Sequence, residues 1–84
     1  MNLTETEKII LENTDERCEY IARDENGDLY VYTMKPKKRP RLWDCGEGEC
    51  ETLRAFNHLF KDIKWEDKEP LQFRNDKGEC LLWL

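Results

Sequence analysis

The sequence lacks most features that mark membrane proteins and enzymes. Its longest uninterrupted apolar run, Leu81 to Leu84, is far shorter than the roughly 20 residues of a membrane-spanning helix. Residues 1–7 have neither the basic cluster nor the apolar stretch of a secretory signal, so we expect a cytoplasmic protein with reduced thiols. There is no phosphate-binding glycine loop, His-Glu-x-x-His or Gly-x-Ser-x-Gly pattern, and no cysteine context typical of an activated nucleophile. We therefore expect a protein that is not an enzyme.

Apolar residues are also scarce. They make up 38% of the 84 residues, whereas 39% are charged, compared with about 25% in an ordinary domain. A chain of this length supports one hydrophobic core, so we expect a single domain over residues 1–84. Three Trp, three Tyr and three Phe argue against disorder, because disordered segments are poor in aromatic residues.

Charge is distributed unevenly along the chain. The net charge is −5, yet residues 35–41 (Lys-Pro-Lys-Lys-Arg-Pro-Arg) contain five basic residues and no acid. We call these seven residues the basic strap. Its two prolines exclude a helix and remove two backbone donors from any sheet, which predicts an extended surface connection between two acidic parts of the chain.

Two elements are predicted before the strap. Thr4 and Glu7 form a capping-box pattern, which predicts a short helix ending near Asn13 or Asp15, with Ile10 and Leu11 facing inward. Next, residues 19–24 and 28–34 are rich in strand-forming side chains and flank an Asn-Gly pair, which predicts a hairpin. A two-residue Asn-Gly loop places Ala22 opposite Val31 and Ile21 opposite Tyr32, with apolar or aromatic residues on both faces.

The remaining elements follow the strap. Residues 41–45 are predicted to form a short strand, and the glycines of residues 46–48 a turn. Over residues 51–63 the apolar positions have helical spacing, which predicts a second helix with an inner stripe of Leu53, Phe56, Leu59, Phe60 and Ile63. Residues 71–74 and 79–84 flank a turn and predict a second hairpin. The expected fold is α+β, with two short helices and a mainly antiparallel sheet of hairpins.

The four cysteines are candidate metal ligands. Cys45 and Cys50 flank a glycine-rich reversal that can bring both sulfurs to one cation, and Cys18 and Cys80 lie at the ends of predicted elements. Four thiolates suit a tetrahedral structural zinc, which would help to stabilise a domain with a thin core. His58 is an alternative fourth ligand, although the helical projection places it away from the apolar stripe. Inert reduced thiols and disulfides are the alternatives to zinc.

The charge pattern suggests two kinds of partner. The basic strap could neutralise phosphates while Tyr30, Tyr32 and Trp43 stack on bases, although the acidic remainder of the chain opposes binding to a polyanion. Conversely, an acidic protein is attracted to a basic groove that normally holds nucleic acid, and such a protein would act as an inhibitor. Solubility alone is a third explanation of the acidity. No cluster of acidic residues stands out as the partner-binding surface.

Two segments carry a resemblance to a known group of proteins. Trp-Asp-Cys-Gly-Glu-Gly-Glu-Cys at residues 43–50 and Trp-Glu-Asp-Lys-Glu-Pro at residues 65–70, with the size, acidity and cysteine set, resemble small accessory proteins of phages and prophages of Gram-positive bacteria. Within that group the chain resembles zinc-containing anti-CRISPR proteins directed at type II effectors. The resemblance implies a phage protein that is not an enzyme, binds Cas9 in the bacterial host cell and interferes with guide or target-DNA engagement. It also implies zinc on Cys18, Cys45, Cys50 and Cys80. Nucleic-acid binding through residues 35–41 is the alternative function.

Overall fold

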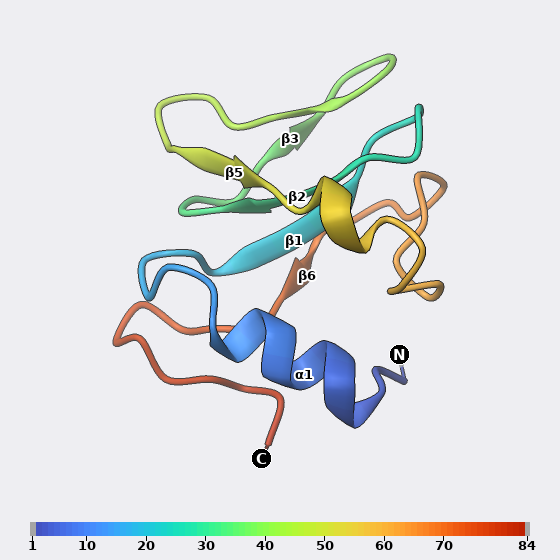
Figure 1. The fold of residues 1–84 in the computed structure, drawn as a ribbon. Helices are drawn as coiled ribbons and strands as arrows, with labels where there is room; N and C mark the ends of the chain where they lie inside the picture. The colour runs from blue at the N-terminus through green and yellow to red at the C-terminus, as the bar shows by residue number, and fades with distance from the viewer. Residues whose placement is uncertain (1, 84) are drawn as a thin grey trace.

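A four-stranded antiparallel sheet forms the centre of the computed structural model, which describes residues 2–83 (Figure 1). Its strand order is β5-β2-β1-β6, so β5 and β6 form the two edges. The bounds are β1 Tyr20–Arg23, β2 Leu29–Tyr32, β5 Cys50–Thr52 and β6 Leu71–Gln72. Two further strands, β3 (Lys37–Lys38) and β4 (Trp43–Asp44), pair with each other, and the helices are α1 (Glu5–Glu12) and the 3-10 turn η1 (Arg54–Phe56). The mainly antiparallel sheet is confirmed, but among the described residues it is accompanied by one α-helix and not by the two helices that the sequence predicted.

The capping box at the start of α1 is also confirmed. The Glu7 N–H donates to the Thr4 hydroxyl at 3.1 Å, while the Thr4 N–H donates to the Glu7 carboxylate at 2.9 Å. The helix is capped at Asn13, as predicted, and it buries Leu11 in the core beneath the sheet. Within residues 2–83, no helix combines the length and apolarity that a membrane crossing requires.

The first hairpin is present, but its predicted register is wrong by one residue. The loop has three residues, Glu25–Gly27, because Asp24 and Asp28 still pair: the Asp24 N–H donates to the Asp28 carbonyl at 2.9 Å. The Gly27 N–H turns back to the Asp24 carbonyl at 2.9 Å, with Gly27 at a φ of +94° that favours glycine.

The pairing register of this hairpin determines which side chains lie on each face of the sheet. Ile21 lies opposite Val31, and Ala22 lies opposite Tyr30. The face with Ile21 and Val31 packs in the main core with Leu11, whereas Ala22 packs with Tyr32 and Trp43 in a second cluster. Both faces are therefore covered by apolar groups, as the sequence predicted.

The predicted helix over residues 51–63 is wrong. Residues 50–52 form β5, only η1 is helical, and the following residues form turns, with Phe60 at a φ of +57°. The physical reason lies in two distant side chains. The Arg23 guanidinium donates to the carbonyls of Asn57, Leu59, Phe60 and Ile63 at 2.8–3.1 Å, and the Glu7 carboxylate accepts from the Phe60 N–H. These contacts satisfy backbone groups that helical hydrogen bonds would otherwise use.

The apolar stripe of this segment nevertheless points inward. Phe60 and Ile63 are buried in the main core, and Leu53, Phe56 and Leu59 pack against it while partly exposed. A chain of tight turns thus buries the same residues that a helix would have buried.

The C-terminal reversal is confirmed in a reduced form. β6 pairs with β1, and beyond it a single antiparallel bridge joins Arg74 to Cys80 around the predicted turn. Arg74 is 3% exposed, and its guanidinium donates at 2.7–3.2 Å to four carbonyls near the end of α1, those of Leu11, Glu12, Asp15 and Cys18. This segment therefore holds the end of α1 against the sheet.

Except for the buried Pro36, the basic strap is exposed, as predicted, although part of it forms a strand. Lys37 pairs with Asp44 and Lys38 with Trp43, so the strand predicted over residues 41–45 is limited to Trp43–Asp44. The predicted turn follows, with the Gly48 N–H donating to the Cys45 carbonyl at 3.0 Å.

Candidate functional site

Cys45 and Cys50 lie together where the turn after β4 returns into β5. Cys50 is exposed and Cys45 is partly buried. Desolvation raises the pKa of the Cys50 thiol, and the neighbouring Cys45 thiol raises that pKa further. The glycine-rich reversal therefore brings two thiols together, as the sequence predicted.

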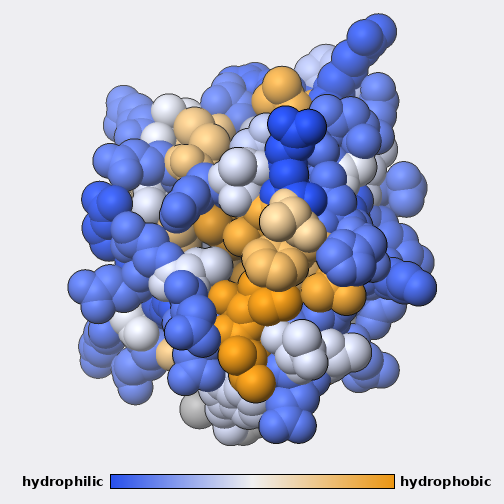
Figure 2. All heavy atoms as spheres, in the orientation of Figure 1, coloured by the Kyte–Doolittle hydropathy of each residue, from blue (hydrophilic) through white to orange (hydrophobic). Residues whose placement is uncertain are grey.

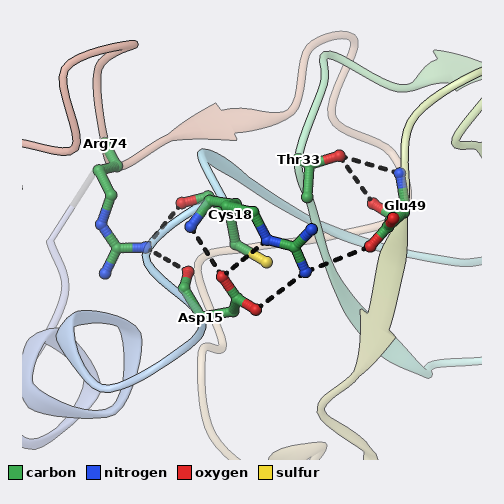
Figure 3. A network of polar contacts seen from close by, with 6 residues as sticks. Asp15, Cys18, Thr33, Glu49 and Arg74 are labelled. Atoms are coloured by element: carbon green, nitrogen blue, oxygen red, sulfur yellow. Dashed lines mark hydrogen bonds and ion pairs between the residues drawn. The ribbon is translucent and has the colours of Figure 1, made fainter.

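Cys18 lies close by but in a different environment. It is 2% exposed, and burial raises the pKa of its thiol to about 11. Cys18 and Cys50 both line a cavity of about 220 Å³, where Arg17 bridges the carboxylates of Asp15 and Glu49 at 3.1 and 3.3 Å. Figure 3 shows Asp15, Cys18 and Glu49 in this polar network.

Cys80 lies near the opposite edge of the sheet. It pairs with Arg74 beyond β6, whereas Cys50 belongs to β5, and three strand spacings of about 4.8 Å separate β5 from β6. Each thiolate on a zinc ion lies about 2.3 Å from the metal. Thiols on segments three strand spacings apart are too far from each other to bind the same ion. Among residues 2–83, no three Cys, His, Asp or Glu side chains form a group that could hold a metal ion. The four thiols do not fit one tetrahedral ion in this arrangement, and zinc binding stays a prediction.

His58, the alternative ligand, is exposed, as the sequence predicted. It lines a shallow pocket beside the start of α1 with Glu7 and Asp62. Cysteine does not contribute to that pocket.

Most cations of the basic strap have partners within the fold. Lys35 pairs with Glu69 at 2.9 Å and Arg39 with Asp44 at 3.3 Å. The Lys38 ammonium donates to the carbonyls of Trp65 and Asp67, and it lies 4.3 Å from the Trp65 ring centroid and 5.4 Å from that of Trp43. In the part of the chain that the structure describes, Lys37 and Arg41 form no ion pair, so about two strap charges remain available.

The aromatic residues predicted to stack on bases are largely inaccessible. Tyr32 is 1% exposed and Trp43 is 5% exposed, because both form the second cluster under the strap. Tyr30 is only partly buried. Base stacking needs an open ring face, so the structure does not support Tyr32 and Trp43 as a stacking platform.

A groove of about 430 Å³ lies between the second half of α1 and the segment formed by β5 and η1. It is lined by apolar and polar side chains from both segments, namely Ile9, Ile10, Asn13, Thr14, Asp15, Glu51, Leu53 and Phe56. We call this feature the α1–β5 groove. Ile9 is 48% exposed, and Figure 2 shows a hydrophobic area on the face that carries α1 and η1.

Two carboxylates, those of Asp15 and Glu51, line the α1–β5 groove. Outside the groove lining, Glu5 and Glu12 are exposed about one helical turn on either side of Ile9, and Glu12 accepts a hydrogen bond from the Trp83 indole N–H at 2.9 Å. Glu51 is exposed on the opposite wall. At the helix end, a hydrogen bond from Arg17 holds the pKa of Asp15 below its usual range, so this carboxylate is charged but paired. The groove therefore combines apolar walls with an acidic rim formed by Asp15 and Glu51, of which Asp15 is paired with Arg17.

Sequence reasoning missed this groove, although one signal pointed to it. Ile9, Ile10 and Leu11 are consecutive, and the inner face of a short helix cannot bury three neighbouring residues equally. Leu11 enters the core, Ile10 packs beside it, and Ile9 is left at the surface. The opposite wall depended on η1, which the prediction of a longer helix obscured.

No protein-family model matches the chain, and neither curated proteins nor solved structures give a match.

Proposed function

We propose that this chain is a binding protein, not an enzyme, that docks through the α1–β5 groove on a basic surface of a nucleic-acid-binding effector protein. The observation that supports the proposal is the combination of exposed Ile9, a cavity of about 430 Å³ and an acidic rim in one place. An isolated exposed apolar residue needs no explanation, but an apolar groove with charged borders is typical of an interaction site.

The two parts of the groove would contribute in different ways. Burying one aliphatic side chain is worth roughly 1.5–3 kcal/mol before the costs of association, so Ile9 and its neighbours can supply affinity. The rim carboxylates would mainly accelerate the encounter with a basic partner and orient it. Binding should therefore weaken as salt increases, and it should depend most strongly on the apolar walls.

The resemblance stated above supports one class of effector, the type II CRISPR nuclease Cas9. Such a nuclease holds its guide–target duplex in a positively charged channel, and carboxylates on a small protein can occupy phosphate-binding positions there. We propose that the chain is a phage-encoded inhibitor that acts in the bacterial host cell by blocking nucleic-acid engagement. Its action is stoichiometric binding.

A capture experiment tests the proposal. Tagged protein would be incubated with purified Cas9, with and without guide RNA, and retained Cas9 would be quantified at several salt concentrations. We expect capture that is stronger without guide RNA and weaker at high salt. Absence of a complex under every condition would remove Cas9 as the partner.

Matched variants test whether the groove is the binding surface. Ile9 and Leu42 are 48% and 45% exposed, and Leu42 lies in another pocket, with Tyr30 and Trp43. We expect Ile9→Ser to weaken capture about tenfold, as the loss of one buried aliphatic contact predicts, while Leu42→Ser leaves it nearly unchanged. Equal losses in the two variants would contradict docking through the groove.

A further inference from the structure

The edge strand β5 offers backbone groups to a partner. Within residues 2–83, β5 pairs with β2 alone, and all three of its residues are exposed. Around it, the Thr33 N–H donates to the Glu49 carbonyl at 3.0 Å and the Leu53 N–H donates to the Leu29 carbonyl at 2.8 Å. Hydrogen bonding alternates along an antiparallel strand, so the backbone groups of Cys50 and Thr52 point away from β2.

Side chains along β5 alternate between the two sheet faces. Glu51 lies opposite Val31, which packs in the main core, and Glu51 also lines the α1–β5 groove. Cys50 and Thr52 lie opposite Tyr32 and Tyr30, and therefore project toward the other face. A chain lying along this edge would place every second side chain over the groove.

We infer that the partner segment recognised here is an extended peptide that adds to the sheet as a new strand beside β5. On its groove-facing side it would place an apolar residue against Ile9, Leu53 and Phe56 and a lysine or arginine against Glu51. The backbone groups of Cys50 and Thr52 would supply the hydrogen bonds, as in other complexes formed by strand addition. This inference rests on the proposed function, because it specifies the segment of the partner that enters the groove.

Protection against aggregation is the simpler explanation of an exposed charged edge. Glu51 alone can discourage pairing between identical edges. That explanation does not account for an apolar groove immediately beside the edge. The adjacency of free backbone groups, an apolar wall and a carboxylate favours a peptide that carries matching groups.

A synthetic peptide tests the inference directly. The peptide would carry threonine at every second position and either valine or lysine at the positions between. In an extended conformation, one face then carries only threonine and the other carries valine and lysine. We expect saturating peptide to slow amide hydrogen exchange at Cys50 and Thr52 about tenfold or more, because both N–H groups become hydrogen-bonded. Two control peptides have the same side chains with alternate backbone nitrogens methylated, one in each of the two possible patterns. The pattern that methylates the N–H groups facing β5 should abolish protection of these amides, whereas the other pattern should retain it.

Two variants of the protein test the same contact from the other side. Thr52→Pro removes an outward N–H, which an edge strand tolerates, and should weaken peptide binding about tenfold. Thr52→Val is the matched control, because it keeps the N–H and loses the same hydroxyl, which accepts from the Arg54 N–H at 3.2 Å. It should bind within about threefold of the unchanged protein, with folding of both variants checked by their amide spectra.

The outcomes separate this inference from the proposed function. Equal protection by the methylated peptides, equal binding by the two Thr52 variants, or no peptide binding would overturn strand addition. If Ile9→Ser still weakened capture of the effector in that case, docking through the groove would stand without a new strand. If Ile9→Ser had no effect on capture while the peptide protected β5, the groove would bind peptides but not this effector.

Discussion

The two faces of the central sheet present opposite surfaces. On the side of α1, Ile9 is exposed, and the carboxylates of Glu5, Glu12 and Glu51 form no ion pair within residues 2–83. On the other side, Trp43 is buried and the strap cations Lys35, Lys38 and Arg39 are engaged by carboxylates, carbonyls and aromatic rings. The comparison shows that charge counted along a sequence differs from charge available to a partner. Among the described residues, the most basic segment of the chain has few free cations, and the surface that we propose for docking lies on the acidic side.

A bound zinc ion would have the largest effect on this arrangement, because it would tie together segments from both edges of the sheet. Cys50 lies in β5 with Cys18 and Cys45 nearby, whereas Cys80 lies beyond β6, so one ion held by all four thiols would require Cys80 to move toward β5. The sequence predicts about one zinc per chain, with chelation removing on the order of 10 kcal/mol of binding free energy. Elemental analysis without added metal and thermal unfolding with a chelator measure both quantities.

Ligand variants sharpen the metal test. The sequence predicts that Cys18→Ser abolishes stoichiometric zinc while His58→Ala does not. The reverse result would assign the fourth ligand to His58. Zinc absent from the purified protein, with unfolding unaffected by the chelator, would remove the four-thiolate centre.

Arg23 maintains the groove side of the molecule. Its guanidinium donates to five carbonyls, those of Gly27, Asn57, Leu59, Phe60 and Ile63. Arg23→Met keeps much of the apolar stem but leaves these carbonyls without their donor, so we expect a loss of about 3–5 kcal/mol in the free energy of unfolding. Denaturant titration measures it.

Arg17→Met is the control for this experiment. Arg17 forms exposed ion pairs with Asp15 and Glu49, and removing them should cost less than about 1 kcal/mol. Similar losses in both variants would show that Arg23 does not hold the 57–63 segment in place.

Arg23 also explains why this segment could not be predicted. The spacing of Leu53, Phe56 and Phe60 satisfies a helix, and local sequence contains no glycine or proline to suggest otherwise. The competing contacts come from Arg23 and Glu7, which lie more than 30 residues away in the sequence. Periodicity reports which side chains are buried, but it does not identify which distant group satisfies the backbone.

Where the determining contacts are local, prediction succeeded. The capping box of Thr4 and Glu7 involves residues three positions apart, and the Asn-Gly hairpin is set by its own loop. Even there the register was wrong, because the Asp24 and Asp28 pair extends the ladder by one step. The groove required both a local element, α1, and the unpredicted η1, so only one of its walls was accessible to sequence reasoning.

The buried thiol of Cys18 should make the free energy of unfolding depend on pH in the alkaline range. Burial raises the pKa of its thiol from 9.0 to about 11, with Asp15 and Glu51 adding to the rise and Arg74 and Arg17 opposing it. The folded state then binds more protons than the unfolded state between these values, so stability falls as pH rises from 9 to 11. The loss should be on the order of 2 kcal/mol.

The measurement compares the unchanged protein with Cys18→Ala across this pH range. Burial also raises the pKa of Tyr32, which contributes to alkaline unfolding in both proteins. The difference between the two curves therefore isolates Cys18. If stability falls equally in both proteins from pH 9 to 11, burial does not raise the pKa of the Cys18 thiol in the folded state.

Nucleic-acid binding should show the smallest effect. Of the five strap cations, Lys35 and Arg39 form ion pairs and Lys38 contacts carbonyls and aromatic rings, so only Lys37 and Arg41 have no side-chain partner among the described residues. The logarithm of affinity for DNA falls with the logarithm of salt concentration by about 0.9 for each phosphate neutralised, so two available cations predict a slope near −2 and five predict one near −4.5. Shift assays with single- and double-stranded DNA over a range of low salt concentrations measure this slope.

Replacing Lys37, Lys38 and Arg39 by alanine should change the weak DNA binding only slightly if the acidic side is functional. A slope near −4.5 that is lost in this variant would instead favour nucleic-acid binding through residues 35–41, because it would mean that phosphates displace the internal partners of the strap.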